Sequence, residues 1–296
     1  MNLVVTGASG IIGDAFINLY SDAHNIVALT RSVQPGLDTR VSWVETSYTF
    51  DSLCDILSGK DAIVHMAGTR LPSLKQDSFN HYLDNITISD NIFKACVNTG
   101  VKNVVCASSR SVYSDANELP WREAEAAIPA SFYGASKLAM EAIASIYSKK
   151  HGLNVKCLRI AQILSADEQK GYLLRTLFDR AKTNETQTIY GAGKGKREYI
   201  YVKDAARSFM CALQSNEKSG VYNIGAGNTV SISELAEIIN RVFGNLSSIN
   251  YLADKPEDLS ESLMDCSKAE REFGFKVGYS MESAIEDIFG DWSNNK

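Results

Sequence analysis

The sequence predicts an α/β protein with a doubly wound parallel sheet and a smaller, mixed α/β lobe. Three features of the 296 residues support this class. Short apolar runs alternate with amphipathic stretches through the first half, a glycine-rich turn follows the first run, and the alternation changes after about residue 161. Such alternation predicts right-handed β-α-β units, in which ligands bind at the carboxyl ends of the strands.

The predicted strands and helices alternate along the first half of the chain. Apolar, β-branched runs predict strands at 2–6, 25–30, 41–44, 61–66, 103–107 and 155–160. The stretches between them predict helices at 11–20, 50–57, 86–98 and 133–150. After residue 161 the pattern predicts helices at 172–181, 202–213 and 232–242, with short strands at 188–190 and 221–224. No Pro-rich or Ser-rich linker separates the two parts, so we expect the second to pack on the first with a cleft between them.

Composition and charge narrow the classes of function. The 30 Lys and Arg against 35 Asp and Glu give a formal net charge of −5, which disfavours a nucleic-acid partner. No apolar run approaches the roughly 20 residues of a membrane span, and Met1 leads directly into the first strand, so we expect a cytoplasmic protein without a membrane partner. Six cysteines without a Cys-x-x-Cys pair and four histidines without ligand spacing predict free thiols and no metal site.

A glycine-rich turn joins the first predicted strand to the first predicted helix. Residues 6–13 are Thr-Gly-Ala-Ser-Gly-Ile-Ile-Gly. Glycines in this spacing serve a tight turn, a close approach of the backbone to a pyrophosphate and the contact of helix with strand. The turn therefore predicts a Rossmann-like dinucleotide site, although the same spacing occurs in structural turns. Its predicted cofactor contacts are Gly7, Ser9, Gly10, Ile11, Ile12 and Gly13.

The end of the second predicted strand carries Thr30, Arg31 and Ser32 and has no carboxylate. Proteins that bind NAD usually place an acidic side chain here, on the ribose hydroxyls. A guanidinium pairs instead with a 2′-phosphate, so the sequence favours NADP(H), with NAD(H) as the alternative. A solvated surface arginine is the other interpretation of Arg31.

A serine-rich turn after the fifth predicted strand and a tyrosine–lysine pair predict the chemistry. Tyr133 and Lys137 are four residues apart, so their side chains share one face of a helix. An ammonium held beside a phenol favours the phenolate, and Tyr133 can then exchange a proton with a substrate oxygen while a hydride moves to or from a nicotinamide. A hydroxyl from Ser109 would hydrogen-bond the same oxygen. Without the glycine-rich turn, such a pair would more often be a surface pair.

With these motifs in one chain, the sequence resembles the extended short-chain dehydrogenase/reductases over nearly its whole length, in the branch of nucleotide-sugar epimerases, dehydratases and ketoreductases. The resemblance implies a Rossmann-like NAD(P)-binding domain with the catalytic residues at 1–161, and a mainly substrate-binding lobe at 162–296, interleaved with the first. The family's catalytic Ser lies four residues before the Tyr of a Val-Tyr pair, which selects Ser109. Its Tyr and Lys match Tyr133 and Lys137, which also contact the cofactor. Further implied cofactor contacts are Met66, Ala67, Gly68, Arg70 and Asn85.

The resemblance also implies a site for a nucleotide sugar. Tyr190 matches an aromatic residue that flanks the nucleobase, Gln162 replaces a substrate-facing Asn, and Lys255 replaces the Arg of a late Arg-x-x-Asp segment. Arg197 offers a bidentate fork and Lys255 a point charge for a diphosphate, although both are also consistent with solvated surface charges. The implied substrate contacts are Ser109, Tyr113, Gln162, Tyr172, Tyr190, Arg197, Lys255 and Asp258.

Several reactions are consistent with this resemblance. Dehydratases of the family carry Asp-Glu directly after the catalytic Ser or Thr, whereas Arg110 and Ser111 follow Ser109 here, which disfavours dehydration. Through Arg31 the sequence favours reduction of a 4-keto nucleotide sugar, and the alternative is a nucleotide-sugar 4-epimerase that retains NAD. A non-catalytic dinucleotide sensor is a further alternative, disfavoured because the catalytic Ser, Tyr and Lys are all present. The resemblance also implies a homodimer joined by the third and fourth predicted helices.

Overall fold

The larger lobe is built on a seven-stranded sheet in which every neighbouring pair is parallel. The computed structural model describes residues 1–33, 37–70, 78–168, 170–217 and 219–294, and the strand order is β11-β6-β5-β4-β1-β2-β3. The chain order reverses at β1, so a crevice forms at the carboxyl ends of β1 and β4. The strands are β1 (Asn2–Thr6), β2 (Asn25–Thr30), β3 (Ser42–Glu45), β4 (Ala62–His65), β5 (Asn103–Ser109), β6 (Asn154–Ile160) and β11 (Gly220–Ile224).

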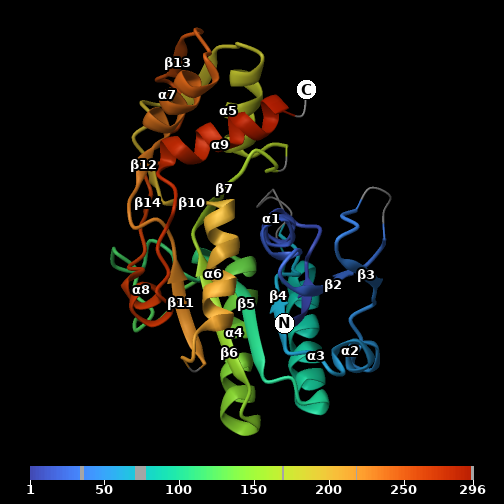
Figure 1. Ribbon diagram of the computed structural model, residues 1–296. Coiled ribbons are helices and arrows are strands. Elements are labelled where there is room, and N and C mark those ends of the chain that lie inside the picture. Colours follow the sequence, from blue (N-terminus) through green and yellow to red (C-terminus); the bar gives the residue numbers. More distant parts are fainter. Residues whose placement is uncertain (34–36, 71–77, 169, 218, 295–296) are drawn as a thin grey trace.

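Helices cover both faces of this sheet (Figure 1). On one face, α2 (Phe50–Leu57), α3 (Leu83–Thr99) and α4 (Phe132–His151) share an apolar core with the strands. On the other face lie α1 (Ile11–Tyr20) and α6 (Val202–Gln214). Because both faces are buried, the strands are nearly continuous apolar runs, as the sequence predicted.

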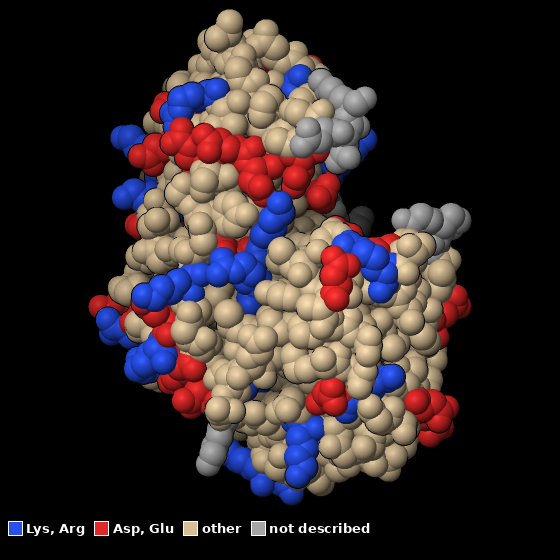
Figure 2. All heavy atoms as spheres, in the orientation of Figure 1, with Lys and Arg blue, Asp and Glu red and all other residues tan. Residues whose placement is uncertain are grey.

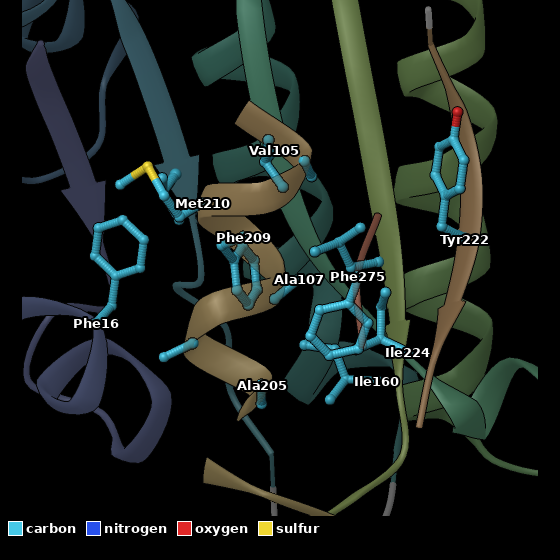
Figure 3. Close-up of a cluster of buried hydrophobic side chains, with 14 of the residues drawn as sticks. Phe16, Val105, Ala107, Ile160, Ala205, Phe209, Met210, Tyr222, Ile224 and Phe275 are labelled. Atoms are coloured by element: carbon cyan, nitrogen blue, oxygen red, sulfur yellow. The ribbon is translucent and has the colours of Figure 1, made fainter. Parts of the chain in front are cut away.

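The core beneath α6 fixes the strand ends that lead to the crevice. Figure 3 shows Phe209 of α6 beside Ala107 of β5, while Phe275 lies against Ile160 of β6 and Ile224 of β11. All five side chains are buried. Burial of an aromatic side chain of this size stabilises a fold by about 1.5–3 kcal/mol, so the position of the β5 carboxyl end is strongly determined.

The smaller lobe combines short strands with helices around a separate apolar core. This core joins α5 (Leu173–Lys182), α7 (Ile232–Phe243) and α9 (Met281–Asn294) to β8 (Gln187–Tyr190), which pairs in parallel with β13 (Ile249–Leu252). The remaining elements are β7 (Gln162–Leu164), β9 (Lys196–Arg197), β10 (Tyr199–Tyr201), β12 (Val230–Ser231), β14 (Glu261–Ser262), α8 (Ser267–Phe273) and the 3-10 helices η2 (Phe79–Tyr82) and η3 (Arg110–Val112).

The two lobes are interleaved in sequence and joined by charged contacts. Both α6 and β11 come from the second half of the chain but belong to the larger lobe, so a division at residue 161 does not separate the lobes in space. Lys203 of α6 lies 2.6 Å from Asp287 and 3.2 Å from Asp291 of α9. Figure 2 shows basic side chains along the lower border of an acidic band on the smaller lobe.

The sequence-based prediction of a Rossmann-like α/β fold is confirmed, and the larger lobe follows it closely. Each strand predicted in the first half is present, with ends shifted by at most two residues. The prediction missed β7, β9, β10, β12, β13, β14, α8 and α9. Within the described ranges, no helix is long and apolar enough to cross a bilayer, and no group of three or more His, Cys, Asp or Glu side chains is placed to hold a metal ion.

Candidate active site

The glycine-rich turn connects β1 to α1 at the carboxyl edge of the sheet. Gly7 has a φ of 67°, and a Cβ at this position would lie 2.6 Å from the backbone nitrogen of Ala67. Glycine is therefore required both by the left-handed conformation and by the close approach of the β4 end. Gly10 donates its N–H to the Gly7 carbonyl at 3.0 Å and leads directly into α1. The unpaired N–H groups at the start of α1 fit a pyrophosphate.

A buried hydrogen-bond network holds the ends of β1 and β4 beside this turn. Thr6 Oγ1 lies 2.8 Å from His65 Nδ1 and accepts the backbone N–H of Ala67 at 3.0 Å. His65 Nε2 lies 3.0 Å from Ser89 Oγ on α3. Burial, with a smaller contribution from the charge of Lys137, lowers the pKa of His65 to about 3. The neutral imidazole therefore serves as a positioning group for the backbone that lines the turn.

Ser109 ends β5 and caps the short helix η3. Its hydroxyl accepts the backbone N–H of Ser111 at 3.1 Å and donates to the Ser111 hydroxyl at 3.2 Å. Two hydroxyl groups therefore lie together at the carboxyl end of a central strand. This is the edge of a parallel sheet where ligands bind.

The first turn of α4 brings Tyr133 toward this serine pair. Ser131 caps the helix by accepting the backbone N–H of Gly134 at 3.1 Å. A Cβ on Gly134 would overlap the carbonyl oxygen of Ser111, so glycine allows α4 to approach η3 closely. The cap and the glycine together set the position of Tyr133 relative to the end of β5.

Lys137 follows Tyr133 by four residues on α4 and is almost entirely buried. Its Nζ donates to the carbonyl oxygen of Ala107 at 2.8 Å and lies 5.9 Å from the centroid of the Tyr133 ring. A buried ammonium requires a polar partner, and the β5 carbonyl supplies it. The positive charge is thereby held beside the aromatic ring of Tyr133.

These elements enclose a cavity of about 380 Å³ at the carboxyl edge of the sheet. Its lining contains the three predicted catalytic residues and most of the predicted contacts of the glycine-rich turn. It also contains Gln162 and Tyr172 from beyond β6. The predicted site residues in its lining are Gly7, Gly10, Ile11, Ile12, Gly13, Met66, Gly68, Arg70, Ser109, Tyr133, Lys137, Gln162 and Tyr172.

The other predicted cofactor contacts lie outside this lining. Asn85 is buried in α3, where its amide oxygen accepts the N–H of Thr69 at 2.7 Å and its amide nitrogen donates to the Thr69 carbonyl at 3.0 Å. The side-chain amide of Asn85 is therefore bonded to the backbone of Thr69. Asn85 positions the segment 68–70 and does not line the cavity. The remaining residues outside the lining are Ser9, Thr30, Arg31, Ser32 and Ala67.

Arg31 lies at the carboxyl end of β2, next to β1 in the sheet. Its side chain is exposed, and Thr30 Oγ1 donates to the carbonyl oxygen of Ser32 at 2.9 Å. The arginine therefore occupies the strand end that the sequence predicted. A 2′-phosphate contact there remains a prediction.

Arg70 is held by residues that follow β7. Its guanidinium lies 3.5 Å from the carboxylate of Glu168 and 4.6 Å from the ring centroid of Tyr172. Glu168 is almost completely buried, and a buried carboxylate is stabilised by a cationic partner. The predicted pairing of Arg70 with a pyrophosphate would therefore have to compete with Glu168.

A second cavity, of about 580 Å³, lies in the smaller lobe and shares Gln162 and Tyr172 with the first. Tyr190 lines it with an exposed ring. Arg197 also lines it, and its Nη2 donates to Asp258 at 2.5 Å while Nη1 donates to the carbonyl oxygens of Lys196 and Ser260. The predicted substrate residues Arg197 and Asp258 thus form one ion pair in the cavity wall.

Two predicted substrate contacts lie elsewhere. Tyr113 is buried, stacks on Trp121 with ring centroids 5.2 Å apart, donates to Asn223 Oδ1 at 3.0 Å and accepts from Arg159 Nη1 at 2.7 Å. Its ring and hydroxyl therefore have partners in the core, and its contact with a substrate remains a prediction. Lys255 is exposed and lies outside the lining of both cavities, because the chain turns Pro256, not Lys255, toward the second one.

Residues 197–204 carry two buried carboxylates with structural partners, Glu198 and Asp204. Glu198 accepts the N–H groups of Gly227 at 2.8 Å and Met264 at 2.9 Å. Burial raises the pKa of Glu198 to about 7 despite these donors. Asp204 accepts the N–H of Gly278 at 2.9 Å. Both carboxylates therefore connect chain segments that are distant in sequence.

Several residues that line the cavities were missed by sequence reasoning. Arg110 and Ser111 line the first cavity, and their position directly after Ser109 could have indicated this. Glu168 also lines it, but nothing in the sequence connects it to Arg70, almost a hundred residues earlier. The missed polar residues of the second cavity are Thr176, Arg180, Thr188, Tyr199 and Glu257.

Comparisons with known proteins show which family and which relatives this chain resembles. The model of the NAD dependent epimerase/dehydratase family matches residues 3–225. The structure of UDP-N-acetylglucosamine 4-epimerase from Bacillus cereus is 35% identical, with a TM-score of 0.87 and 97% of each chain covered. MoeE5 in complex with UDP-glucuronic acid and NAD is 26% identical, with a TM-score of 0.85, 100% of this chain and 99% of that chain covered. The dTDP-4-dehydro-6-deoxyglucose reductase of Escherichia coli is 23% identical over 302 residues, with 97% of this chain and 96% of the reductase covered.

The matched segment spans the whole parallel sheet, including β11. It also contains the glycine-rich turn and the serine, tyrosine and lysine that line the first cavity. The match therefore covers both the fold and the chemical groups that the sequence singled out. On this basis, the chain belongs to the NAD-dependent epimerase/dehydratase family, within the extended short-chain dehydrogenase/reductases that act on nucleotide sugars.

Proposed function

We propose that this protein is a 4-epimerase of a uridine diphosphate hexose and that it retains NAD. The observation that carries the proposal is the meeting of Ser109, Tyr133 and Lys137 in one cavity with the glycine-rich turn. The 35% identity to a UDP-N-acetylglucosamine 4-epimerase over 97% of the chain supports the reaction and the nucleotide. The bound NAD of MoeE5 supports the cofactor.

The cavity fits a dinucleotide because the glycine-rich turn lines it and the start of α1 offers unpaired N–H groups. In the proposed reaction Tyr133 takes the proton of the sugar 4-hydroxyl through its phenol oxygen. Lys137 stabilises the phenolate form of Tyr133 before this transfer, since its ammonium is held beside the ring, and Tyr133 is a neutral phenol afterwards. Ser109 donates a hydrogen bond to the same sugar oxygen. A bound NAD would supply the hydride chemistry at C4 in both half-reactions.

Inversion at C4 requires that the hydride return to the opposite face of the sugar. Tyr133 then gives its proton back to the 4-oxygen, and the sugar must turn between the two half-reactions. The sugar can turn if the protein holds the nucleotide in place and leaves the sugar ring free to rotate. We therefore assign the nucleotide to the second cavity, where Tyr190 offers an aromatic face and Arg180 offers positive charge. Arg197 lines the same cavity, and a diphosphate would have to compete with Asp258 for its guanidinium. The shared Gln162 then lies where the sugar passes into the first cavity.

A second candidate is reduction of a 4-keto nucleotide sugar by NADPH, and Arg31 favours it. An exposed guanidinium at the end of β2 would attract a 2′-phosphate. The full-length similarity to a dTDP-4-dehydro-6-deoxyglucose reductase is consistent with this reaction. The residues of the first cavity would serve both candidates, because each needs a proton carrier, a lysine and a nicotinamide.

The dinucleotide that accompanies the purified protein separates the two candidates. We expect denaturation to release about one NAD per chain, because the proposed epimerase regenerates its cofactor in every cycle and does not need to exchange it. Liquid chromatography with mass spectrometry measures the identity and amount of the released dinucleotide. A protein purified without a dinucleotide, with NADPH bound about ten- to a hundredfold more tightly than NADH, would contradict the epimerase and support the reductase.

We further propose a cytoplasmic homodimer joined through α3 and α4. Both helices carry exposed apolar side chains, including Leu83 and Val97 on α3 and Ile146 on α4. Apolar side chains on neighbouring helices favour a protein–protein contact. The proposal otherwise rests on the homodimer that the family resemblance implies.

A further inference from the structure

Arg110 is an unpaired cation in the wall of the first cavity. It opens η3 directly after Ser109, and its guanidinium has no hydrogen bond or ion pair with any described residue. The other two cations of this wall are engaged: Arg70 pairs with Glu168, and Lys137 donates to the Ala107 carbonyl. A partly buried guanidinium with five unused donors is costly unless a ligand or water pairs with it.

The residues around Arg110 add positive charge and do not neutralise the charge of its guanidinium. Burial lowers the pKa of Arg110, and the positive charges of Arg197 and Arg70 lower it further. Tyr199 and Glu198 act in the opposite direction and raise it. The carboxylate of Glu198 already accepts the backbone N–H groups of Gly227 and Met264. Burial also raises the pKa of Glu198 to about 7. The carboxylate therefore offsets the charge of Arg110 weakly near neutral pH.

The position of Arg110 decides which part of a substrate it can reach. Ser109 and Tyr133 place the reacting sugar carbon in this cavity, and Arg110 adjoins Ser109 in the chain. An anionic group on the same sugar ring would then share this cavity with the guanidinium. A carboxylate matches the planar fork of arginine in two parallel hydrogen bonds.

We propose that Arg110 selects a nucleotide sugar whose ring carries a carboxylate, a uridine diphosphate hexuronic acid, over the neutral hexose. The inference rests on the proposed function, since it assumes that the sugar of a UDP compound enters the first cavity. The diphosphate is the other anion of such a substrate, and we assign it to the second cavity, which Arg180 and Arg197 line.

Binding to the holoenzyme tests this assignment with three probes: UDP-glucuronate, UDP-glucose and UDP. Isothermal titration calorimetry gives their dissociation constants for the wild type, for Arg110→Gln and for Arg110→Lys. Arg271→Gln is a matched control, because it removes an exposed guanidinium on α8. Thermal melting checks that each variant is folded, and the lysine variant retains the charge if the glutamine variant is unstable.

We expect the wild type to bind UDP-glucuronate about 10- to 100-fold more tightly than UDP-glucose, the range of a charge-assisted hydrogen-bond pair. Arg110→Gln should remove this preference by weakening UDP-glucuronate alone, Arg110→Lys should keep part of it, and Arg271→Gln should keep all of it. Equal affinities in the wild type would overturn the inference, as would an equal loss for UDP, which would assign Arg110 to the diphosphate. If UDP itself failed to bind, the proposed function and the inference would both be overturned.

Discussion

Tyr133→Phe should lower turnover by at least ~100-fold, the lower range for loss of a general acid–base group. The substitution removes the proposed proton carrier and keeps the ring that lies against Tyr82, with ring centroids 5.9 Å apart, and beside Lys137. Substrate and cofactor contacts are otherwise unchanged, so binding should change little. Steady-state kinetics with a UDP-hexose, together with the dinucleotide content of the variant, measures both effects.

Tyr20→Phe is a suitable control for this experiment. Tyr20 ends α1 and contacts Phe16 and His24, away from the lining of either cavity. Loss of this phenol hydroxyl should leave turnover within about twofold, because Tyr20 lines neither cavity. Unchanged turnover in Tyr133→Phe would refute the assignment of Tyr133 as the proton carrier.

Glu141→Met should lower the free energy of unfolding by about 3–5 kcal/mol, because it leaves a buried guanidinium without its anion. Glu141 on α4 accepts from Arg159 of β6 at 2.6 Å and from the Ser108 hydroxyl at 2.5 Å, and both members of the ion pair are about 5% exposed or less. The pair joins α4 to the strand ends behind the first cavity. Urea-induced unfolding of the wild type and the variant measures the difference.

The double variant Glu141→Met/Arg159→Met separates the contribution of the ion pair to stability from the cost of leaving one charge unpaired. It removes both charges at similar volume, so it should recover at least half of the stability that the single variant loses. The hydroxyls of Tyr113 and Ser108 lose a partner, which limits the recovery. If the two single substitutions proved additive, the pair would contribute nothing specific, contrary to this account.

The larger lobe was predictable because its strands are buried on both faces. Asn2–Thr6 and Asn25–Thr30 are apolar runs with clear ends, and a parallel sheet needs such runs. The smaller lobe offered weaker signals. Lys196–Arg197 and Val230–Ser231 are strands of two residues, too short to show any alternation, and their pairing depends on contacts between distant segments. The amphipathic pattern of Met281–Asn294 could have predicted α9 but was missed.

Motifs predicted which residues lie near the site better than which way they face. The spacing of Tyr133 and Lys137 required one shared helix face, and the structure places both in the cavity lining. Asn85 and Tyr113 belong to similar family segments, but Asn85 binds the backbone of Thr69 and Tyr113 binds Arg159 in the core. The direction of a side chain depends on partners far away in sequence, which a motif does not contain.

Transfer of a C4 deuterium label tests the central claim most directly. UDP-glucose or UDP-glucuronate deuterated at C4 is incubated with the purified protein, without added dinucleotide, and the product is followed by nuclear magnetic resonance. The account predicts conversion to the 4-epimer with the deuterium still on C4, because the hydride leaves and returns within the site that Ser109, Tyr133 and Lys137 line. Absence of conversion, loss of the label to solvent, or a stoichiometric requirement for added NADPH would contradict it.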